Sequence, residues 1–355
     1  MYKDFIYAGG MKGSEHPMKN NLGILAVVLA ASFLFLLVPQ QVDAAGEPFS
    51  YYSQLDENEK AIFDAICGAE LEEREILVDL PIKVSASGKE RYNYLNKLKE
   101  DMFFNVRESV RLSDPMAYWT WGESLNTWTF TATTTVVGDT ETMTAMHVSV
   151  TLNSAYEELE QKRIALVKAV NDFSTKRTDT RGIVEDINNY LVNLVTYETE
   201  EISSIKTPFA HDAYGALVAP NRAVCDGYSK AFLLLCNKYN IECLIDQGSA
   251  LPSTIGHAWN YVKMDNGKWY GIDVTWNDGH NNEYFLLGSE TFFSNHMRGI
   301  VLEYGINFSP FNIPAAFSKD KYDADPPTYE EYAWIFAALI VALLIVALYK
   351  SSKEK

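Results

Sequence analysis

Apolar residues recur at helical or strand spacing along the first half of the chain. A period of three to four residues predicts a helix, and a period of two predicts a strand. We expect helices at 50–75, 90–110 and 155–173, and strands at 76–84, 125–137 and 146–150. Gly138 and Asp139 supply turn chemistry between the last two strands and predict a hairpin. Residues 46–174 are therefore interpreted as a mixed α/β N-terminal module, in which the sequence gathers no cluster of reactive groups.

A polar, charged stretch at 175–181 is the best candidate for a linker to a second domain at 182–325. The pattern predicts a helix over 182–202 and another that begins at Cys225. That second helix carries its apolar residues on one face: Tyr228, Ala231, Phe232, Leu235 and Tyr239. Short alternating strands follow as far as residue 288. A helix followed by consecutive strands indicates an α+β domain.

An uncharged apolar run at 22–38 precedes a small-residue pattern that ends at Ala44. We expect a secretory signal peptide at 1–44. Translation that starts at Met18 would give a signal peptide of ordinary length. The alternative is an uncleaved anchor helix, which also leaves the middle of the chain outside the cell.

A second uncharged run, 333–349, would extend roughly 26 Å as a helix, close to the thickness of a bilayer core. Trp334 and Tyr349 stand at its ends, where aromatic rings prefer the membrane interface. Lysines follow the run and acidic residues precede it, so the tail at 350–355 is expected in the cytoplasm. The sequence therefore predicts a single-pass membrane protein with its domains outside the cell.

The composition of the 355 residues, 47% hydrophobic and 22% charged, excludes a disordered chain. Asp and Glu outnumber Lys and Arg by 47 to 30, which gives a net charge of −17. An acidic chain repels phosphate backbones, so we expect no nucleic acid partner. Four cysteines without a CxxC pair match neither a disulfide scaffold nor a zinc ribbon. Whether Cys236 and Cys243 form a disulfide stays open.

Cys225 is the first candidate for chemistry, because it stands where a helix is expected to begin. The positive end of the helix dipole and the N–H groups of the first turn favour a thiolate, which is the nucleophilic form. Asp226 opposes this effect electrostatically. Taken alone, a cysteine in this position is more often a small buried apolar side chain.

His257 and Asp273 lie in consecutive predicted strands, and the loop between the strands decides whether they can meet. A two-residue turn at Asn266-Gly267 places the two side chains on opposite faces of the hairpin. A three-residue loop with Gly267 in the left-handed conformation places His257 diagonal to Asp273 on one face. Because that loop requires glycine at its third position, we predict the three-residue loop.

A thiol, an imidazole and a carboxylate can together provide a nucleophile, a base and an orienting group. The imidazole of His257 takes the proton of the Cys225 thiol, and the Asp273 carboxylate fixes the tautomer and stabilises the imidazolium. Each residue alone has an ordinary structural explanation. All three together, each on a suitable element, indicate a Cys-His-Asp triad.

Four strings of residues resemble the core domain of the bacterial transglutaminase-like superfamily, over residues 182–290. The strings are Tyr214-Gly215-Ala216-Leu217, Ala223-Val224-Cys225-Asp226-Gly227-Tyr228-Ser229-Lys230-Ala231-Phe232, Gly256-His257-Ala258-Trp259-Asn260 and Lys268-Trp269-Tyr270-Gly271-Ile272-Asp273-Val274-Thr275-Trp276. Two trailing segments also resemble the family, Tyr284-Phe285-Leu286 and Ser294-Asn295-His296. The resemblance implies a papain-like α+β fold, in which a nucleophile helix packs on an antiparallel sheet. It also implies Cys225 as nucleophile, His257 as base and Asp273 as the third member.

Members of this family cross-link or deamidate amides, hydrolyse peptides or have no known activity. The implied mechanism is attack of Cys225 on an amide or peptide carbonyl, with a thioester that water or an amine resolves. The backbone N–H of Cys225 is one candidate oxyanion donor and Tyr214 a weaker one. Trp259 and Trp276 are expected as walls of the substrate cleft. The sequence has no HExxH, EF-hand or phosphate-binding glycine loop, so we expect no metal and no cofactor.

Three classes of function fit these features. The first is a membrane-anchored extracellular thiol enzyme acting on protein or peptide substrates at the cell surface. The second is a catalytically silent binding module on the same fold, and the third is an envelope-assembly component whose N-terminal module binds the partner. The enzyme ranks first because all three reactive residues are present.

Overall fold

The computed structural model describes residues 49–70, 73–84, 88–115, 127–151, 159–199, 209–302, 305–307 and 310–323. The expected signal peptide (1–44), membrane helix (333–349) and cytoplasmic tail (350–355) lie outside these residues. Within the described part of the chain, no helix is both long enough and apolar enough to cross a bilayer.

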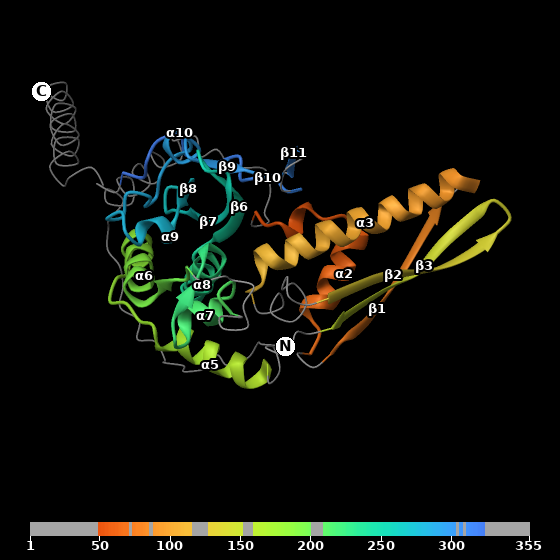
Figure 1. Ribbon diagram of the computed structural model, residues 1–355, viewed down its shortest axis with the longest axis horizontal. Helices are drawn as coiled ribbons and strands as arrows, with labels where there is room; N and C mark the ends of the chain where they lie inside the picture. Colours follow the sequence, from red (N-terminus) through yellow and green to blue (C-terminus); the bar gives the residue numbers. More distant parts are fainter. Residues whose placement is uncertain are drawn as a thin grey trace, which may run out of the picture. The chain divides into compact units, whose positions relative to one another are not determined.

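The described residues of the N-terminal module form a 3-10 helix, two α-helices and a three-stranded sheet (Figure 1). Its elements are η1 (Tyr52–Gln54), α2 (Glu57–Cys67), β1 (Glu75–Val84), α3 (Gly88–Ser113), β2 (Thr127–Val137) and β3 (Thr140–Thr151). The sheet is antiparallel in the order β1-β3-β2. The expected strands and the hairpin at Gly138 are confirmed, whereas α2 is shorter than the expected helix at 50–75.

Local chemistry explains where these elements begin and bend. Asp56 accepts hydrogen bonds from the backbone N–H groups of Asn58 and Glu59, and Glu59 accepts one from the Asp56 N–H, which is a capping box. Pro81 lies where the pairing of β1 with β3 shifts register, a position at which the missing proline N–H is tolerated. The apolar faces of both helices and the sheet then form one core: Ile62, Ile66, Leu95, Met102, Val78, Met146 and Val148.

The second half contains helices around a four-stranded antiparallel sheet in the order β8-β7-β6-β9. Its helices are α5 (Leu159–Asp172), α6 (Thr180–Leu194), α7 (Ala213–Leu217), α8 (Cys225–Lys238), α9 (Val274–Asn277) and α10 (Ser289–Phe292). Its strands are β4 (Thr196–Tyr197), β5 (Arg222–Ala223), β6 (Cys243–Ala250), β7 (Ile255–Lys263), β8 (Trp269–Ile272), β9 (His296–Arg298), β10 (Ile300–Leu302) and β11 (Gly305–Asn307). Helix α8 packs against β6 and β7. The helix that begins at Cys225 therefore lies on an antiparallel sheet, as the resemblance implies.

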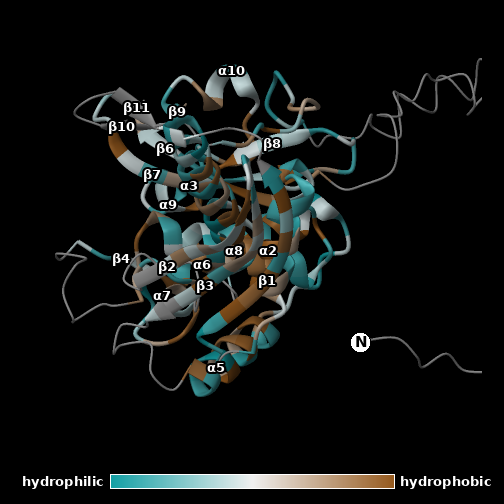
Figure 2. Ribbon diagram, turned by 90° about the vertical axis from the view of Figure 1, so that its right-hand side faces the viewer, coloured by the Kyte–Doolittle hydropathy of each residue, from teal (hydrophilic) through white to brown (hydrophobic). Residues whose placement is uncertain are grey.

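Helix α5 falls within the range expected for the N-terminal module, 46–174, yet it packs with the helices of the second half. Its residues Leu159 and Leu166 share a core with Val184 of α6 and Phe232 of α8. Figure 2 shows hydrophobic and hydrophilic residues alternating along α5, as an amphipathic helix requires. The spacing of apolar residues predicts such a helix but does not identify the surface it covers.

A further core joins the N-terminal module to the four-stranded sheet. Tyr51 and Leu112 pack in one cluster with Ile245 of β6 and Trp259 of β7. The Tyr51 hydroxyl donates a 2.7 Å hydrogen bond to the carbonyl of Ile245. The module and the sheet that carries the candidate site are therefore parts of one packed structure.

Candidate active site

Cys225 is the first residue of α8, as the sequence predicts. The preceding residue, Val224, is extended, and its N–H donates to the carbonyl of Ala210. A Cβ added at Gly227 would lie 2.6 Å from that same Ala210 oxygen, so only glycine lets the first turn of α8 pack this closely. The Cys225 side chain is half-buried. It is thus presented at the positive end of a 14-residue helix.

The four cysteines are all free. Burial raises the pKa of the Cys67 thiol and, together with a hydrogen bond to Cys243, raises that of Cys236 far above its usual range. These two thiols are held in the unreactive protonated form.

The predicted three-residue loop between β7 and β8 is confirmed. Met264 pairs with Lys268, the N–H of Gly267 donates to the carbonyl of Met264, and Gly267 has a left-handed φ of 76°. The ladder continues to the pair Asn260 and Ile272. This register directs His257 and Asp273 to the same side of the hairpin.

Asp273 does not lie in a strand, because β8 ends at Ile272. Its Oδ1 accepts a 3.0 Å hydrogen bond from the N–H of Trp276 and caps α9, so residues 274–277 are helical where alternation predicted a strand. An aspartate with extended backbone is a strong helix start, and this local bond outweighs the strand preference of the β-branched residues that follow.

His257 and Asp273 form a buried pair. His257 Nε2 lies 2.6 Å from Asp273 Oδ2, and the two residues are 8% and 0% exposed. Burial lowers the pKa of His257, but the charge and hydrogen bond of Asp273, with a smaller contribution from Cys225, raise it to about 10. Burial raises the pKa of Asp273, but His257 and His296 lower it to about 2. Because Nε2 faces the carboxylate, Nδ1 is the ring nitrogen left for Cys225.

The amide of Asn260 ties the helix of the thiol to the strand of the imidazole. Its Nδ2 donates 3.0 Å to the carbonyl of Ser229 in α8 and 3.3 Å to that of Leu244 in β6. Asn260 is fully buried on β7, three residues beyond His257. These bonds help to set the spacing between α8 and the sheet.

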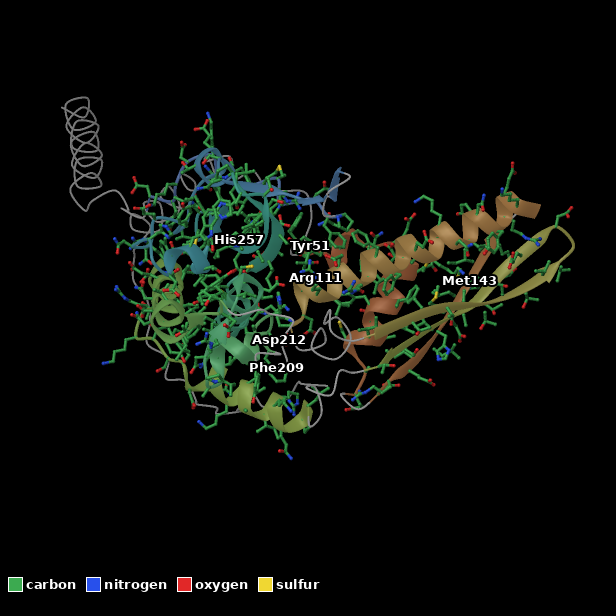
Figure 3. The ribbon with its side chains drawn as sticks, viewed as in Figure 1. Tyr51, Arg111, Met143, Phe209, Asp212 and His257 are labelled. Atoms are coloured by element: carbon green, nitrogen blue, oxygen red, sulfur yellow. The ribbon has the colours of Figure 1, made fainter. Side chains whose placement is uncertain are left out.

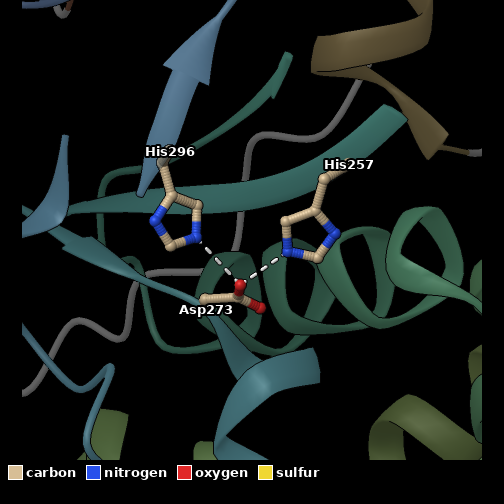
Figure 4. A group of neighbouring side chains, drawn as sticks. All are labelled: His257, Asp273 and His296. Carbon is tan, nitrogen blue, oxygen red and sulfur yellow. Dashed lines mark hydrogen bonds and ion pairs between the residues drawn. The ribbon is translucent and has the colours of Figure 1, made fainter. Parts of the chain in front are cut away.

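His296 is a second imidazole on the same carboxylate oxygen, and Figure 4 shows the two rings on either side of Asp273. Its Nε2 lies 3.0 Å from Asp273 Oδ2, and its ring stacks on Phe292 with centroids 4.0 Å apart. The string Ser294-Asn295-His296 stands out in the sequence, but no spacing assigns it a partner. Pairing of β9 with β6 is the long-range contact that brings it to the site.

The two tryptophans differ in their surroundings. Trp276 is half-buried and stacks on His257, with centroids 4.9 Å apart and planes 18° apart. Trp259 is 0% exposed and packs against His296 and Phe292, so it belongs to the core and not to the wall of an open cleft. Alternation placed Trp259 on the same strand face as His257, but it could not show how deeply that face is covered.

Two tyrosines are relevant to the nucleophile. Tyr214, the weaker candidate oxyanion donor, is half-buried in α7 with its ring 4.9 Å from Phe209. Tyr197 of β4 pairs with Ala223 beside the start of α8. Burial raises the pKa of Tyr197, and the charges of Cys225 and Asp273 raise it further. Its hydroxyl therefore lies within electrostatic range of both candidate residues. The sequence offered no signal for Tyr197.

His257, Asp273 and His296 also have the composition of a metal site, with ligand atoms within 4.8 Å of one another. Two ligands of one tetrahedral zinc ion would lie about 3.3 Å apart. The 2.6 Å separation of His257 from Asp273 fits a charge-assisted hydrogen bond instead. We therefore interpret the group as two histidines that share hydrogen bonds to one oxygen of Asp273.

Residues 167–274 match the family model of the transglutaminase-like superfamily. The match includes Cys225, His257 and Asp273 and ends before His296. The chain thus has a mixed α+β fold with a transglutaminase-like core.

Three solved structures are similar at low identity. They are a TGase (17% identity, TM-score 0.29, 59% of this chain and 53% of that one), a proposed cysteine protease from Cytophaga hutchinsonii (13%, 0.26, 42% and 64%), and the periplasmic domain of TgpA from Pseudomonas aeruginosa bound to ethylmercury (11%, 0.23, 43% and 66%). The chain spans less than two thirds of the length of each. None of the curated proteins matches the chain.

Proposed function

We propose, from the premise of a transglutaminase-like core at residues 167–274, that this protein is a thiol enzyme acting on amide or peptide carbonyls. One observation carries the proposal: His257 is held by the Asp273 carboxylate at 2.6 Å, and a hydrogen bond with Cys225 contributes to its raised pKa. These features support a nucleophile, a base and an orienting group that act together, as acyl transfer requires.

The reaction proceeds in two halves. His257 takes the proton of the Cys225 thiol before substrate binds, in keeping with its pKa of about 10, and the thiolate of this ion pair then forms a bond to the carbonyl carbon of the substrate. The C–N bond then breaks, His257 returns the proton to the leaving amine, and a thioester remains. In the second half, water gives hydrolysis or deamidation, and a second amine gives cross-linking.

Charge develops on the carbonyl oxygen during both halves. The N–H groups in the first turn of α8 have no acceptor within the helix, and that of Cys225 is the nearest donor to the sulfur. Tyr214 remains a predicted second donor. Trp276, stacked on His257, covers one face of the imidazole, which favours its pairing with Asp273 over contact with water.

We also propose that the enzyme works outside the cell, anchored by residues 333–349, on protein or peptide substrates at the surface. The uncharged run and the lysines that follow it support this placement. Protease treatment of intact cells tests it: the domains should be digested while the tail at 350–355 is protected.

Asp226, whose charge opposes a thiolate at Cys225, favours the catalytically silent binding module. His211 and Arg111 place compensating groups beside that carboxylate, which weakens this support. We therefore retain the enzyme as the proposed function.

Alkylation of the full chain with iodoacetamide across pH tests the proposal, with mass spectrometry to locate the label. Cys225 should react rapidly well below the ordinary thiol pKa of about 8.5. The fast phase should disappear in Cys225→Ala and persist in Cys243→Ala, a half-buried thiol that serves as the matched control. If Cys225 reacts no faster than in the urea-unfolded chain, the binding module is the better interpretation.

The product then identifies the reaction. Incubation with glutamine-bearing peptides and an amine probe should give a mass increase on Cys225 that corresponds to a thioester. Probe attached to the peptide indicates transfer, a glutamate product indicates deamidation, and a cleaved peptide indicates proteolysis.

A further inference from the structure

Asp226 directly follows the candidate nucleophile and bears a charge that a neighbouring thiolate would resist. Its side chain is 23% exposed. Burial raises its pKa, but a hydrogen bond from His211 and the charges of Lys230 and Arg111 more than offset this, so the pKa lies well below its usual range. Asp226 is therefore ionised, and its effect on Cys225 depends on these counter-charges.

The groups around Asp226 come from three different parts of the chain. His211 Nδ1 lies 3.1 Å from Asp226 Oδ2, in the segment before α7. Lys230 extends from the next turn of α8, where its Nζ donates to the carbonyl of His211 and lies 3.8 Å from Asp212. Arg111 Nη1 lies 3.9 Å from Asp226 Oδ1 and belongs to α3 of the N-terminal module. His257 and Tyr197 also lie within electrostatic range of the thiol, because Cys225 contributes to the raised pKa of each.

Arg111 is fixed in place rather than freely mobile. Its side chain is 8% exposed, and its Nη2 and Nε donate to Glu108 at 2.6 Å and 3.3 Å. Glu108 also accepts a 2.8 Å hydrogen bond from Gln247 of β6. Figure 3 shows Arg111 at the C-terminal end of α3, beside Tyr51, whose hydroxyl is bonded to β6. The next residue, Leu112, is buried in the core shared with the sheet.

We propose that the N-terminal module contributes a residue to the active site. Arg111, near the C-terminal end of α3, is a positioning residue that compensates the charge of Asp226 beside Cys225. The inference rests on the proposed function, since it takes Cys225 as the nucleophile. It assigns the N-terminal module a role other than binding a partner. Arg111 touches neither sulfur nor substrate and acts through Asp226.

Removal of Arg111 should make the thiolate harder to form. With one cation fewer, the Asp226 charge acts more strongly on Cys225 and raises the pH at which alkylation reaches half its maximum rate. Below that midpoint the fraction of thiolate falls about tenfold when the midpoint rises by one on the pH scale, and the alkylation rate falls with it. We expect alkylation at pH 6 to slow by about three- to tenfold, with the limiting rate at high pH unchanged.

The test compares two double variants of the full chain. Glu108→Gln with Arg111→Met removes both members of the pair, so that neither is left buried and unpaired. Glu160→Gln with Arg163→Met removes a more exposed pair of the same residue types, also three residues apart and at 2.6 Å, on α5. Both leave the net charge unchanged, and thermal unfolding monitors folding. Only the first should shift the alkylation profile of Cys225.

A second pair of variants separates electrostatic positioning from structural support. In an Asp226→Asn background there is no carboxylate through which Arg111 can act, so Glu108→Gln with Arg111→Met should no longer shift the profile, whereas a direct effect of the Arg111 charge on the sulfur would persist. A shift of equal size with and without Asp226→Asn would overturn the inference, as would an unshifted profile in the first double variant. If wild-type Cys225 itself shows no enhanced reactivity, the proposed function fails instead, so the two failures are distinguishable.

Discussion

Asp273 uses its two oxygens for different purposes. Oδ2 accepts hydrogen bonds from both His257 and His296, and Oδ1 accepts one from the N–H of Trp276. One side chain therefore orients the candidate base and starts a helix. It is also fully buried, so its charge is compensated by hydrogen bonds from these neighbours and not by water.

Replacement Asp273→Asn should lower stability in a defined pH window. The raised pKa of His257 stabilises the fold below the unfolded value of about 6.5, and this contribution is lost as pH rises through about 10. The lowered pKa of Asp273 stabilises it above about 3.9, and that contribution is lost as pH falls towards about 2. The deficit should therefore be largest between about pH 4 and 6.5, where we expect about 3 kcal/mol.

Urea unfolding at pH 5.5 and at pH 10 measures this deficit. Asp278→Asn is the control, because Asp278 accepts a hydrogen bond from the Tyr228 hydroxyl, and no histidine of the described segments bonds to it. A deficit for Asp273→Asn that is the same at both pH values would contradict the buried ion pair.

His296 should act on the thiol only through Asp273. His296→Leu removes one donor to the carboxylate and should slow alkylation of Cys225 at pH 6 by about tenfold, comparable with other positioning partners of a triad or metal ligand. His296→Gln keeps a donor and should be affected less. Equal rates for His296→Leu and the wild type would show that His257 is oriented without His296.

At the scale of elements, the first turn of α8 depends on a glycine. Gly227→Ala would place its Cβ 2.6 Å from the Ala210 carbonyl and 2.7 Å from the Ala223 Cβ, so the turn must move. We expect a loss of about 1–3 kcal/mol and slower alkylation of Cys225. Gly256→Ala is the control, since its Cβ would meet nothing within 4 Å. Equal stability of the two variants by urea unfolding would contradict the close packing.

Local signals in the sequence predict much of the site. Glycine at position 267 determines the loop and hence the register that brings His257 to Asp273. Asp273 is also a local signal for the start of a helix. The alternating pattern of apolar residues, however, continues past Asp273 and predicts a strand at the same positions. His296 and Arg111 carry no such signal, because β9 and α3 reach the site only through contacts distant in sequence.

At the scale of the whole molecule, the core between the N-terminal module and the sheet makes the two interdependent. A fragment of residues 155–323 would expose the surfaces of Leu244 and Trp259 that Tyr51, Leu55 and Leu112 cover. We expect it to bind a hydrophobic dye and to unfold at a lower temperature than a fragment of residues 49–323. Matching melting temperatures and no dye binding would show that the second half is self-sufficient.

Helix α3 of the N-terminal module has 26 residues and carries Arg111 in its last turn. At 1.5 Å per residue it is about 39 Å long, and Arg111 near its C-terminal end lies beside Asp226. Such coupling acts in both directions. If Arg111 stabilises the thiolate of Cys225, then acylation, which removes the negative charge of that sulfur, weakens the attraction of this site for Arg111. The chemical state of Cys225 would then affect how strongly the C-terminal end of α3 is held at Asp226.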